Sequence, residues 1–225
     1  MKFAAKIFMP KSDAKHDAHA NATADDQPAM APHRCAVALL LIDVINDLEW
    51  ENGDLIEPHA RQMSAQIAGL KARAKLLDIP VIYVNDNFGQ WRSDLRALVN
   101  HLLKDGVRGE FLARELHPDD DDYFVLKPKH SGFFSTTLDV LLQYLGVKTL
   151  ILTGLAGNIC VLFTANDAYI RDFKVVVPRD CLASNQTEEN EHAINVMSHI
   201  LKADITPSHE LDLEKLLEES TAAAQ

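Results

Sequence analysis

Residues 150–168 have the sequence Leu150-Ile-Leu-Thr-Gly-Leu-Ala-Gly-Asn-Ile-Cys-Val-Leu-Phe-Thr-Ala-Asn-Asp-Ala168, and this stretch decides the fold. A short apolar run ends at Gly154, small residues follow, and Cys160 begins a segment with apolar residues at helical spacing. This order predicts a strand, a tight turn and the first turn of a helix. A thiol placed there meets the positive end of the helix dipole, which favours the nucleophilic thiolate. The alternative interpretation is a small buried cysteine on the apolar side of a helix.

Apolar runs alternate with amphipathic segments along the rest of the chain. We expect strands at residues 36–42, 80–85, 123–126, 149–152, 174–177 and 204–206. We expect helices at residues 60–77, 95–103, 136–145, 160–171, 188–202 and 211–219, with Gly146 as a cap after the third of them. Strands and helices in alternation predict right-handed crossovers and a parallel sheet between two layers of helices. The predicted fold class is therefore α/β.

The length of 225 residues suits a single folded domain with a well-buried core. Residues 11–33 are rich in Ala, Asp, His, Asn and Pro and contain almost no branched apolar side chains. Such a segment buries too little apolar surface to offset its ordering entropy. We therefore expect a disordered or weakly ordered leader over residues 1–34 and one domain over residues 35–225.

Composition excludes several classes of partner. The net charge of −11, from 33 acidic and 22 basic residues, opposes nucleic-acid binding. No apolar run approaches the roughly 20 residues that cross a bilayer, so we expect no membrane partner. Three cysteines, Cys35, Cys160 and Cys181, form no Cys-x-x-Cys pair, which favours a reducing cytoplasm. The spacing of the ten histidines gives no metal motif. The acid run at residues 119–122 is interpreted as a solvated loop, with a cation site as the alternative.

Three chemically active side chains follow predicted strands, two of them directly. Asp43 follows the first strand, Lys127 the third and Cys160 the fourth. Because chemistry in parallel sheets collects at the carboxyl ends of the strands, we expect the three to meet in one cleft. Asp43 could instead cap a turn or helix, and Lys127 could be a surface lysine at a strand exit. Together these side chains would supply the catalytic groups of a cysteine hydrolase. Asp43 would accept the thiol proton, Lys127 would favour the thiolate, and Cys160 would attack an electrophilic carbon.

Several motifs resemble the isochorismatase-like cysteine hydrolases, which include nicotinamidases, N-carbamoylsarcosine amidases and ureidoacrylate amidases. The resemblance covers roughly residues 36–185 and rests on five segments. These are Leu41-Ile-Asp-Val-Ile-Asn-Asp-Leu48, Lys127-Pro-Lys-His-Ser-Gly-Phe-Phe-Ser-Thr-Thr-Leu138, Gly154-Leu-Ala-Gly-Asn-Ile-Cys-Val161, Thr164-Ala-Asn-Asp-Ala168 and Asp180-Cys-Leu-Ala-Ser184.

The resemblance implies a three-layer, Rossmann-like fold with a six-stranded parallel sheet in the order 3-2-1-4-5-6 and helices on both faces. It also implies a catalytic triad of Asp43, Lys127 and Cys160, with a cis peptide bond between Leu155 and Ala156. The N–H groups of Ala156 and Cys160 would then form the oxyanion hole. Relatives are usually homo-oligomers, so we expect a homo-oligomer. We also expect no cofactor.

The chain departs from the family pattern at informative positions. Many relatives carry Gln and Phe where this chain has Ile45 and Leu48, and many carry Thr where it has Gly157. Nicotinamidases bind a metal through an Asp-x-His motif, whereas residues 85–91 contain no His, so we expect no metal. Phe88, Trp91 and Phe133 are candidate walls of the substrate pocket, with ordinary packing as the alternative.

Three functional hypotheses remain at this point. The first is a metal-independent cysteine hydrolase of a small-molecule substrate, namely an amide, carbamoyl or ureido compound, that works through a thioester. The second is a vinyl-ether hydrolase of the isochorismatase type, in which Asp43 is the acid and Cys160 is incidental. The third is a catalytically idle, oligomeric assembly protein on the same fold, which Gly157 favours.

Overall fold

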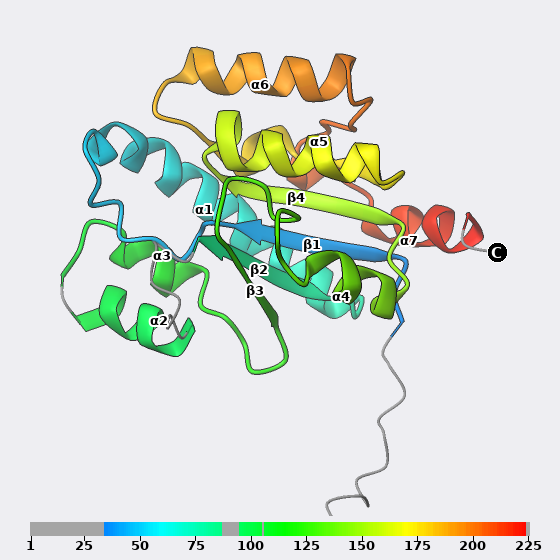
Figure 1. Cartoon of the computed structure of the whole chain (residues 1–225), viewed down its shortest axis with the longest axis horizontal. Coiled ribbons are helices and arrows are strands. Elements are labelled where there is room, and N and C mark those ends of the chain that lie inside the picture. Colours follow the sequence, from blue (N-terminus) through cyan, green and yellow to red (C-terminus); the bar gives the residue numbers. More distant parts are fainter. Residues whose placement is uncertain (1–33, 87–94, 105, 224–225) are drawn as a thin grey trace, which may run out of the picture. The chain divides into compact units, whose positions relative to one another are not determined.

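The computed structural model describes residues 34–86, 95–104 and 106–223 (Figure 1). The predicted leader, except for Arg34, lies outside these residues. The strands are β1 (Val37–Ile42), β2 (Val81–Asp86), β3 (Tyr123–Lys127), β4 (Thr149–Leu155), β5 (Lys174–Val176) and β6 (Leu182–Ala183). The helices are α1 (Gly53–Leu76), α2 (Leu95–Lys104), α3 (Glu110–Glu115), α4 (Leu138–Leu145), α5 (Leu162–Ile170), α6 (Thr187–His199) and α7 (Leu213–Ala222). Three short helices are η1 (Gly157–Val161), η2 (Arg179–Cys181) and η3 (Ser208–Glu210).

The strands form one parallel sheet in the order β3-β2-β1-β4-β5, with β6 paired to β4. The central strand β1 pairs with β2 through Leu40 and Ile82, and with β4 through Leu40 and Leu152. Parallel neighbours need crossover connections, which the helices between the strands supply. The predicted α/β fold with a six-stranded sheet is confirmed.

The sixth strand is formed by different residues from those predicted. Strand β5 pairs with β4 only up to Ile151, so the end of β4 keeps a free edge. Residues Leu182 and Ala183 of β6 pair with this edge, opposite Gly154 and Leu155. The segment predicted as a strand at residues 204–206 makes a single bridge to β5, between Asp204 and Val176.

Alternate residues of the strands face two separate hydrophobic clusters. Leu39 and Leu41 of β1 belong to a cluster with buried residues of α1, α2, α3 and α7. Leu40 and Ile42 belong to a second cluster with buried residues of α4, α5 and α6. Because successive side chains of a strand point to opposite faces, the sheet is the middle of three layers (Figure 1).

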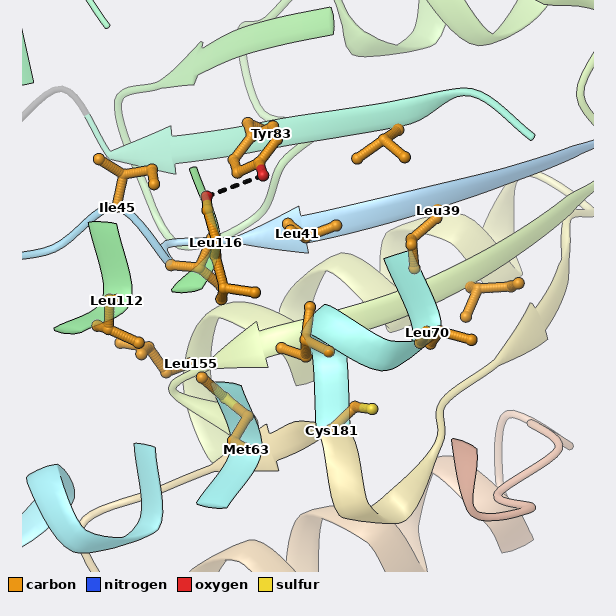
Figure 2. Packing of buried hydrophobic residues seen from close by; sticks show 14 of the residues in the cluster. Leu39, Leu41, Ile45, Met63, Leu70, Tyr83, Leu112, Leu116, Leu155 and Cys181 are labelled. Atoms are coloured by element: carbon orange, nitrogen blue, oxygen red, sulfur yellow. Dashed lines mark hydrogen bonds between the residues drawn. The ribbon is translucent and has the colours of Figure 1, made fainter. Parts of the chain in front are cut away.

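The first cluster includes a tyrosine whose buried hydroxyl is hydrogen-bonded. Figure 2 shows Leu39 and Leu41 of β1 in this cluster together with Leu70 of α1. The hydroxyl of Tyr83 on β2 donates a hydrogen bond to the carbonyl oxygen of Leu116 at 2.9 Å (Figure 2). This bond satisfies a buried polar group and joins the sheet to the chain after α3.

Helix boundaries differ from the prediction mainly at α1. The prediction began this helix at Ala60, whereas it begins at Gly53 and includes Pro58. Ile56 is fully buried and extends the apolar stripe of the helix toward its start, which stabilises the additional turn. Gly146 is confirmed as the cap of α4, with a φ angle of 77°. Among the described helices, none combines the length and apolar character needed to cross a bilayer.

Gly154, near the end of β4, allows close contact between the two central strands. Its φ angle is 115°, which an L side chain rarely adopts, and a Cβ atom here would lie 2.0 Å from the carbonyl oxygen of Ile42. Only glycine fits both constraints. This close pairing positions the residues that follow β1 and β4 next to each other.

We predict that Gly154→Ala lowers the free energy of unfolding by about 3 kcal/mol or more, because it adds backbone strain to a clash with the neighbouring strand. Denaturant unfolding of the two proteins would measure the difference. The matched control is Gly69→Ala in α1, where a Cβ atom meets nothing within 4 Å. Since alanine is the better helix former, that control should gain up to about 1 kcal/mol. A Gly154→Ala protein as stable as the unmodified one would contradict this account.

Candidate active site

Asp43 lies directly after β1, at the carboxyl edge of the sheet. Its φ angle is 53°, a left-handed conformation that Asp tolerates better than most residues. Its N–H donates to the carbonyl oxygen of Val84 at 3.0 Å, which continues the β1–β2 ladder. Only 4% of the residue is exposed, and its Oδ1 accepts a hydrogen bond of 2.7 Å from the N–H of Asp86. The carboxylate is therefore held in place by the ends of two strands.

Lys127 is the last residue of β3 and is fully buried, with 0% exposure. Its Nζ lies 2.8 Å from Oδ2 of Asp43 and 3.6 Å from Oδ2 of Asp86. Buried charges occur in proteins when they are paired, and this ammonium has two carboxylate neighbours. The same Nζ lies 3.5 Å from Sγ of Cys160.

Cys160 lies in η1, the short π-helix between β4 and α5, and is partly buried. A π-helical turn at this position differs from the α-helical start that the sequence predicted. The structure thus brings together the three predicted side chains, and the ammonium of Lys127 contacts both the Asp43 carboxylate and the Cys160 sulfur.

The electrostatics of the site hold Lys127 charged and make Asp43 more basic. Burial raises the pKa of the Asp43 carboxyl above its usual range, and the charge and hydrogen bond of Lys127 only partly offset this effect. Burial also disfavours the ammonium of Lys127, but the negative charge and hydrogen bond of Asp43, together with the charge of Asp86, outweigh it and raise the pKa of Lys127. Asp43 is therefore suited to accept a proton while Lys127 keeps its own.

The pKa of Cys160 is raised to about 12, first by burial and then by the adjacent charge of Asp43. Lys127 lowers the pKa of the thiol, in the direction that the sequence predicted, but it does not compensate for burial and the nearby carboxylate. The protonated thiol is therefore the favoured form of Cys160 at neutral pH.

The turn before η1 contains a cis peptide bond between Leu155 and Ala156. The carbonyl oxygen of Ala156 accepts hydrogen bonds from the N–H groups of Ile159 at 3.1 Å and Val161 at 3.2 Å. These bonds fix the start of the segment that carries Cys160. The oxyanion hole formed by the N–H groups of Ala156 and Cys160 stays a prediction.

Gly157 leaves room for a polar pair that supports the same turn. A Cβ atom at Gly157 would lie 2.3 Å from Oδ1 of Asn190 and 3.2 Å from Oγ of Ser184. Ser184 Oγ accepts a hydrogen bond from the N–H of Asn158 at 3.2 Å and donates one to Asn190 Oδ1 at 2.9 Å. The side chains of Ser184 and Asn190 thus occupy the space that a larger residue 157 would fill.

Thr164 joins the loop after Lys127 to the helix after Cys160. Its buried hydroxyl donates to the carbonyl oxygen of Cys160 at 2.7 Å and accepts from the N–H of Gly132 at 2.9 Å. One hydroxyl group therefore links the two segments that carry the ammonium and the sulfur.

His130 was not identified by sequence analysis, although it belongs to the same site. Its Nδ1 lies 4.0 Å from the sulfur of Cys160, and its ring packs against Phe163 with ring centroids 5.6 Å apart. His130 is exposed, whereas Asp43 and Lys127 are buried. The available signal was its position, three residues after Lys127 in a loop at the carboxyl edge of the sheet.

The predicted pocket walls are described only in part. Phe88 and Trp91 lie outside the described residues. Phe133 has 5% exposure, and its ring centroid lies 6.0 Å from that of Phe173 and 4.7 Å from the guanidinium carbon of Arg171. It belongs to the second hydrophobic cluster, so its role as a pocket wall stays a prediction.

The acid run is more than a solvated loop. The carboxylates of Asp119, Asp121 and Asp122 lie within 4.8 Å of one another, close enough for a metal ion. However, Lys71 lies 2.8 Å from the buried carboxylate of Asp122, and Lys75 lies 2.7 Å from Asp121. Ammonium groups therefore balance the negative charge of this cluster, which fixes the loop before β3 on α1.

We predict that Asp43→Asn accelerates the alkylation of Cys160 by iodoacetamide at pH 8. Removing the carboxylate removes a charge that raises the pKa of the thiol, so the thiolate fraction increases. The rate for the unmodified protein should rise steadily with pH toward 12, since the pKa of Cys160 is about 12. Peptide mass spectrometry would follow Cys160 separately from Cys35 and Cys181. Slower alkylation of the Asn variant would show that Asp43 does not raise the pKa of the thiol.

We predict that Thr164→Val lowers the free energy of unfolding by about 1–2 kcal/mol, because the buried N–H of Gly132 loses its acceptor. Denaturant unfolding would measure this loss. Thr164→Ser retains the hydroxyl and serves as the control, with a smaller loss expected. Equal stabilities of the Val and Ser variants would mean that the hydroxyl is not a structural link.

Comparisons with known proteins identify the family. The isochorismatase domain model matches residues 37–209. An uncharacterized isochorismatase family protein of Bacillus subtilis, YaaI, is 41% identical over 77% of this chain and 95% of its own length. The isochorismatase of Bacillus subtilis is 33% identical over 59% of this chain and 44% of its own length. The crystal structure of N-carbamoylsarcosine amidase from Thermoplasma acidophilum matches with a TM-score of 0.61 and 26% identity, over 78% of this chain and 98% of that one. The resemblance found in the sequence is confirmed, and the chain belongs to the isochorismatase-like family of hydrolases.

Proposed function

We propose that the protein is a metal-independent cysteine hydrolase of a small amide, carbamoyl or ureido compound. The observation that carries this proposal is the position of the Lys127 ammonium, 2.8 Å from the Asp43 carboxylate and 3.5 Å from the Cys160 sulfur. A base, a fixed cation and a thiol in contact are the parts required for nucleophilic attack on a carbonyl carbon. The similarity to N-carbamoylsarcosine amidase supports a carbon–nitrogen bond as the target.

In this mechanism the thiol loses its proton during the attack rather than beforehand. The Cys160 sulfur forms a bond to the carbonyl carbon while its proton moves to the carboxylate of Asp43. The ammonium of Lys127 keeps its proton and balances the negative charge that remains near the sulfur. The N–H groups of Ala156 and Cys160 would stabilise the oxyanion.

The second half of the reaction returns the proton and releases the product. Asp43 gives its proton to the leaving nitrogen as the carbon–nitrogen bond breaks, which leaves a thioester on Cys160. A water molecule then hydrolyses the thioester and regenerates the thiol. The raised pKa of Asp43 matches a group that must first accept and then donate a proton.

The charges around the triad support catalysis without a metal. The carboxylates of Asp43 and Asp86 share the ammonium of Lys127, which occupies the position where a cation is needed. A divalent metal at the same carboxylates would experience repulsion from this buried ammonium. We also expect a homo-oligomer located in the cytoplasm, and sedimentation of the purified protein would test the oligomeric state.

The alternative is vinyl-ether hydrolysis of the isochorismatase type. Burial raises the pKa of Asp43, which would also suit a carboxylic acid that protonates a carbon–carbon double bond. The similarity to the isochorismatase of Bacillus subtilis supports this alternative. In that reaction Asp43 is essential and Cys160 is not.

Variants of the two residues separate these functions. Ammonia release from small amides, N-carbamoyl amino acids and ureido acids would be followed, and isochorismate hydrolysis would be assayed in parallel. We predict that Cys160→Ala lowers amide hydrolysis at least about 10³-fold, since removal of a catalytic nucleophile has effects of this size or larger. Asp43→Asn should abolish either reaction.

Cys35→Ala is the matched control, because Cys35 precedes β1 and Asp43 follows the other end of that strand. This control should retain full activity. Ammonia release that survives Cys160→Ala would exclude the thioester mechanism. Hydrolysis of isochorismate that survives Cys160→Ala but not Asp43→Asn would establish the alternative.

A further inference from the structure

The Cys160 sulfur has different chemical groups on its two sides. The buried groups Asp43 and Lys127 lie on the protein side, whereas the exposed His130 lies on the solvent side. Nδ1 of His130 is 4.0 Å from the sulfur, so the imidazole contacts the atom that becomes acylated. The proposed mechanism uses only the buried side.

A thioester mechanism needs a base twice, first for the thiol and then for the attacking water. Asp43 is well placed for the thiol but poorly placed for water. Its Oδ1 accepts a 2.7 Å hydrogen bond from the N–H of Asp86, and its Oδ2 contacts Lys127 at 2.8 Å. It is also 4% exposed, so both oxygen atoms face the protein. Water reaches the thioester from the solvent side, and within the described part of the chain the imidazole of His130 is an exposed base in contact with the sulfur.

We propose that His130 is a further catalytic residue, the general base that activates water for hydrolysis of the thioester on Cys160. This inference rests on the proposed function. In the step, a water oxygen forms a bond to the thioester carbonyl carbon while one water proton moves to the imidazole of His130. The carbon–sulfur bond then breaks, the acid product leaves, and the imidazolium returns its proton to the Cys160 thiolate. Water and thioester are thus converted to acid and thiol with no other reactant.

The packing of His130 supports a fixed position for the imidazole. Its ring lies against Phe163 with an interplanar angle of 55°, and Phe163 belongs to α5, the helix that continues directly from the segment carrying Cys160. The His130 ring therefore packs on the helix that continues from the segment carrying the nucleophile. Such placement lowers the entropic cost of bringing a base, water and thioester together.

The two half-reactions can be measured separately with p-nitrophenyl acetate. Release of p-nitrophenolate in a burst reports acetylation of Cys160, and the later steady rate reports loss of the acetyl group. We predict that His130→Gln and His130→Phe retain the burst and lower the steady rate about 100-fold, a typical contribution of a general base. Intact-mass spectrometry should then show one acetyl group accumulating on Cys160. The Phe variant keeps a ring beside Phe163, which separates lost packing from lost chemistry.

Lys129→Gln is the matched control, because Lys129 is the exposed neighbour of His130 in the same loop. It should retain both phases. Hydroxylamine, which attacks thioesters with little need of a base, should restore turnover of the His130 variants. A His130 variant with an unchanged steady rate, or with burst and steady rate reduced in equal proportion, would overturn the proposal. Failure of the proposed function has a different signature: no burst in the unmodified protein, or a burst that persists in Cys160→Ala.

Discussion

The active site depends on one buried ion pair, formed by Asp43 and Lys127 across the carboxyl edge of the sheet. Taking a single charge out of water costs several kcal/mol, so neither residue would remain buried and ionised alone. Their contact at 2.8 Å, together with the hydrogen bond from the Asp86 N–H, therefore fixes the ends of β1, β2 and β3 relative to one another. The same pair sets the electrostatic environment of Cys160. The Asp43–Lys127 ion pair therefore both fixes the strand ends and determines the charge next to the Cys160 sulfur.

The consequence for the sulfur is a resting thiol rather than a thiolate. Helix N-termini and nearby cations lower thiol pKa values, but burial and a carboxylate act in the opposite direction, and here they prevail. In the proposed mechanism, such a thiol gains reactivity when a carbonyl group is positioned to accept the sulfur and Asp43 is positioned to accept the proton. The proposal therefore couples the nucleophilicity of Cys160 to substrate binding.

Sequence patterns predicted the parts of the structure that depend on local order. Apolar runs of strand length marked the central strands, and the rule for parallel sheets placed Asp43, Lys127 and Cys160 at one edge. Features that depend on contacts between segments far apart in the sequence were not predicted. The sixth strand depends on the free edge that β5 leaves on β4, and the pKa of Cys160 depends on burial by several elements. The contact of His130 with the Cys160 sulfur depends on the path of the loop after Lys127. The spacing of apolar residues in the sequence does not predict the path of a loop.

The glycine at position 157 does not count against cysteine chemistry. Many relatives carry Thr at the position of Gly157, and the lack of this Thr favoured the hypothesis of a catalytically idle assembly protein. In this structure a hydroxyl group still supports the turn, because Ser184 Oγ accepts the Asn158 N–H at 3.2 Å. Asn190 holds that hydroxyl from α6 and lies where a residue 157 side chain would be, 2.3 Å from an added Cβ atom. Gly157 and Asn190 are therefore complementary: Asn190 of α6 holds the Ser184 hydroxyl, and this hydroxyl accepts the hydrogen bond from the Asn158 N–H of the turn. With glycine at position 157, the turn before Cys160 thus has a hydrogen-bonding partner from outside the turn.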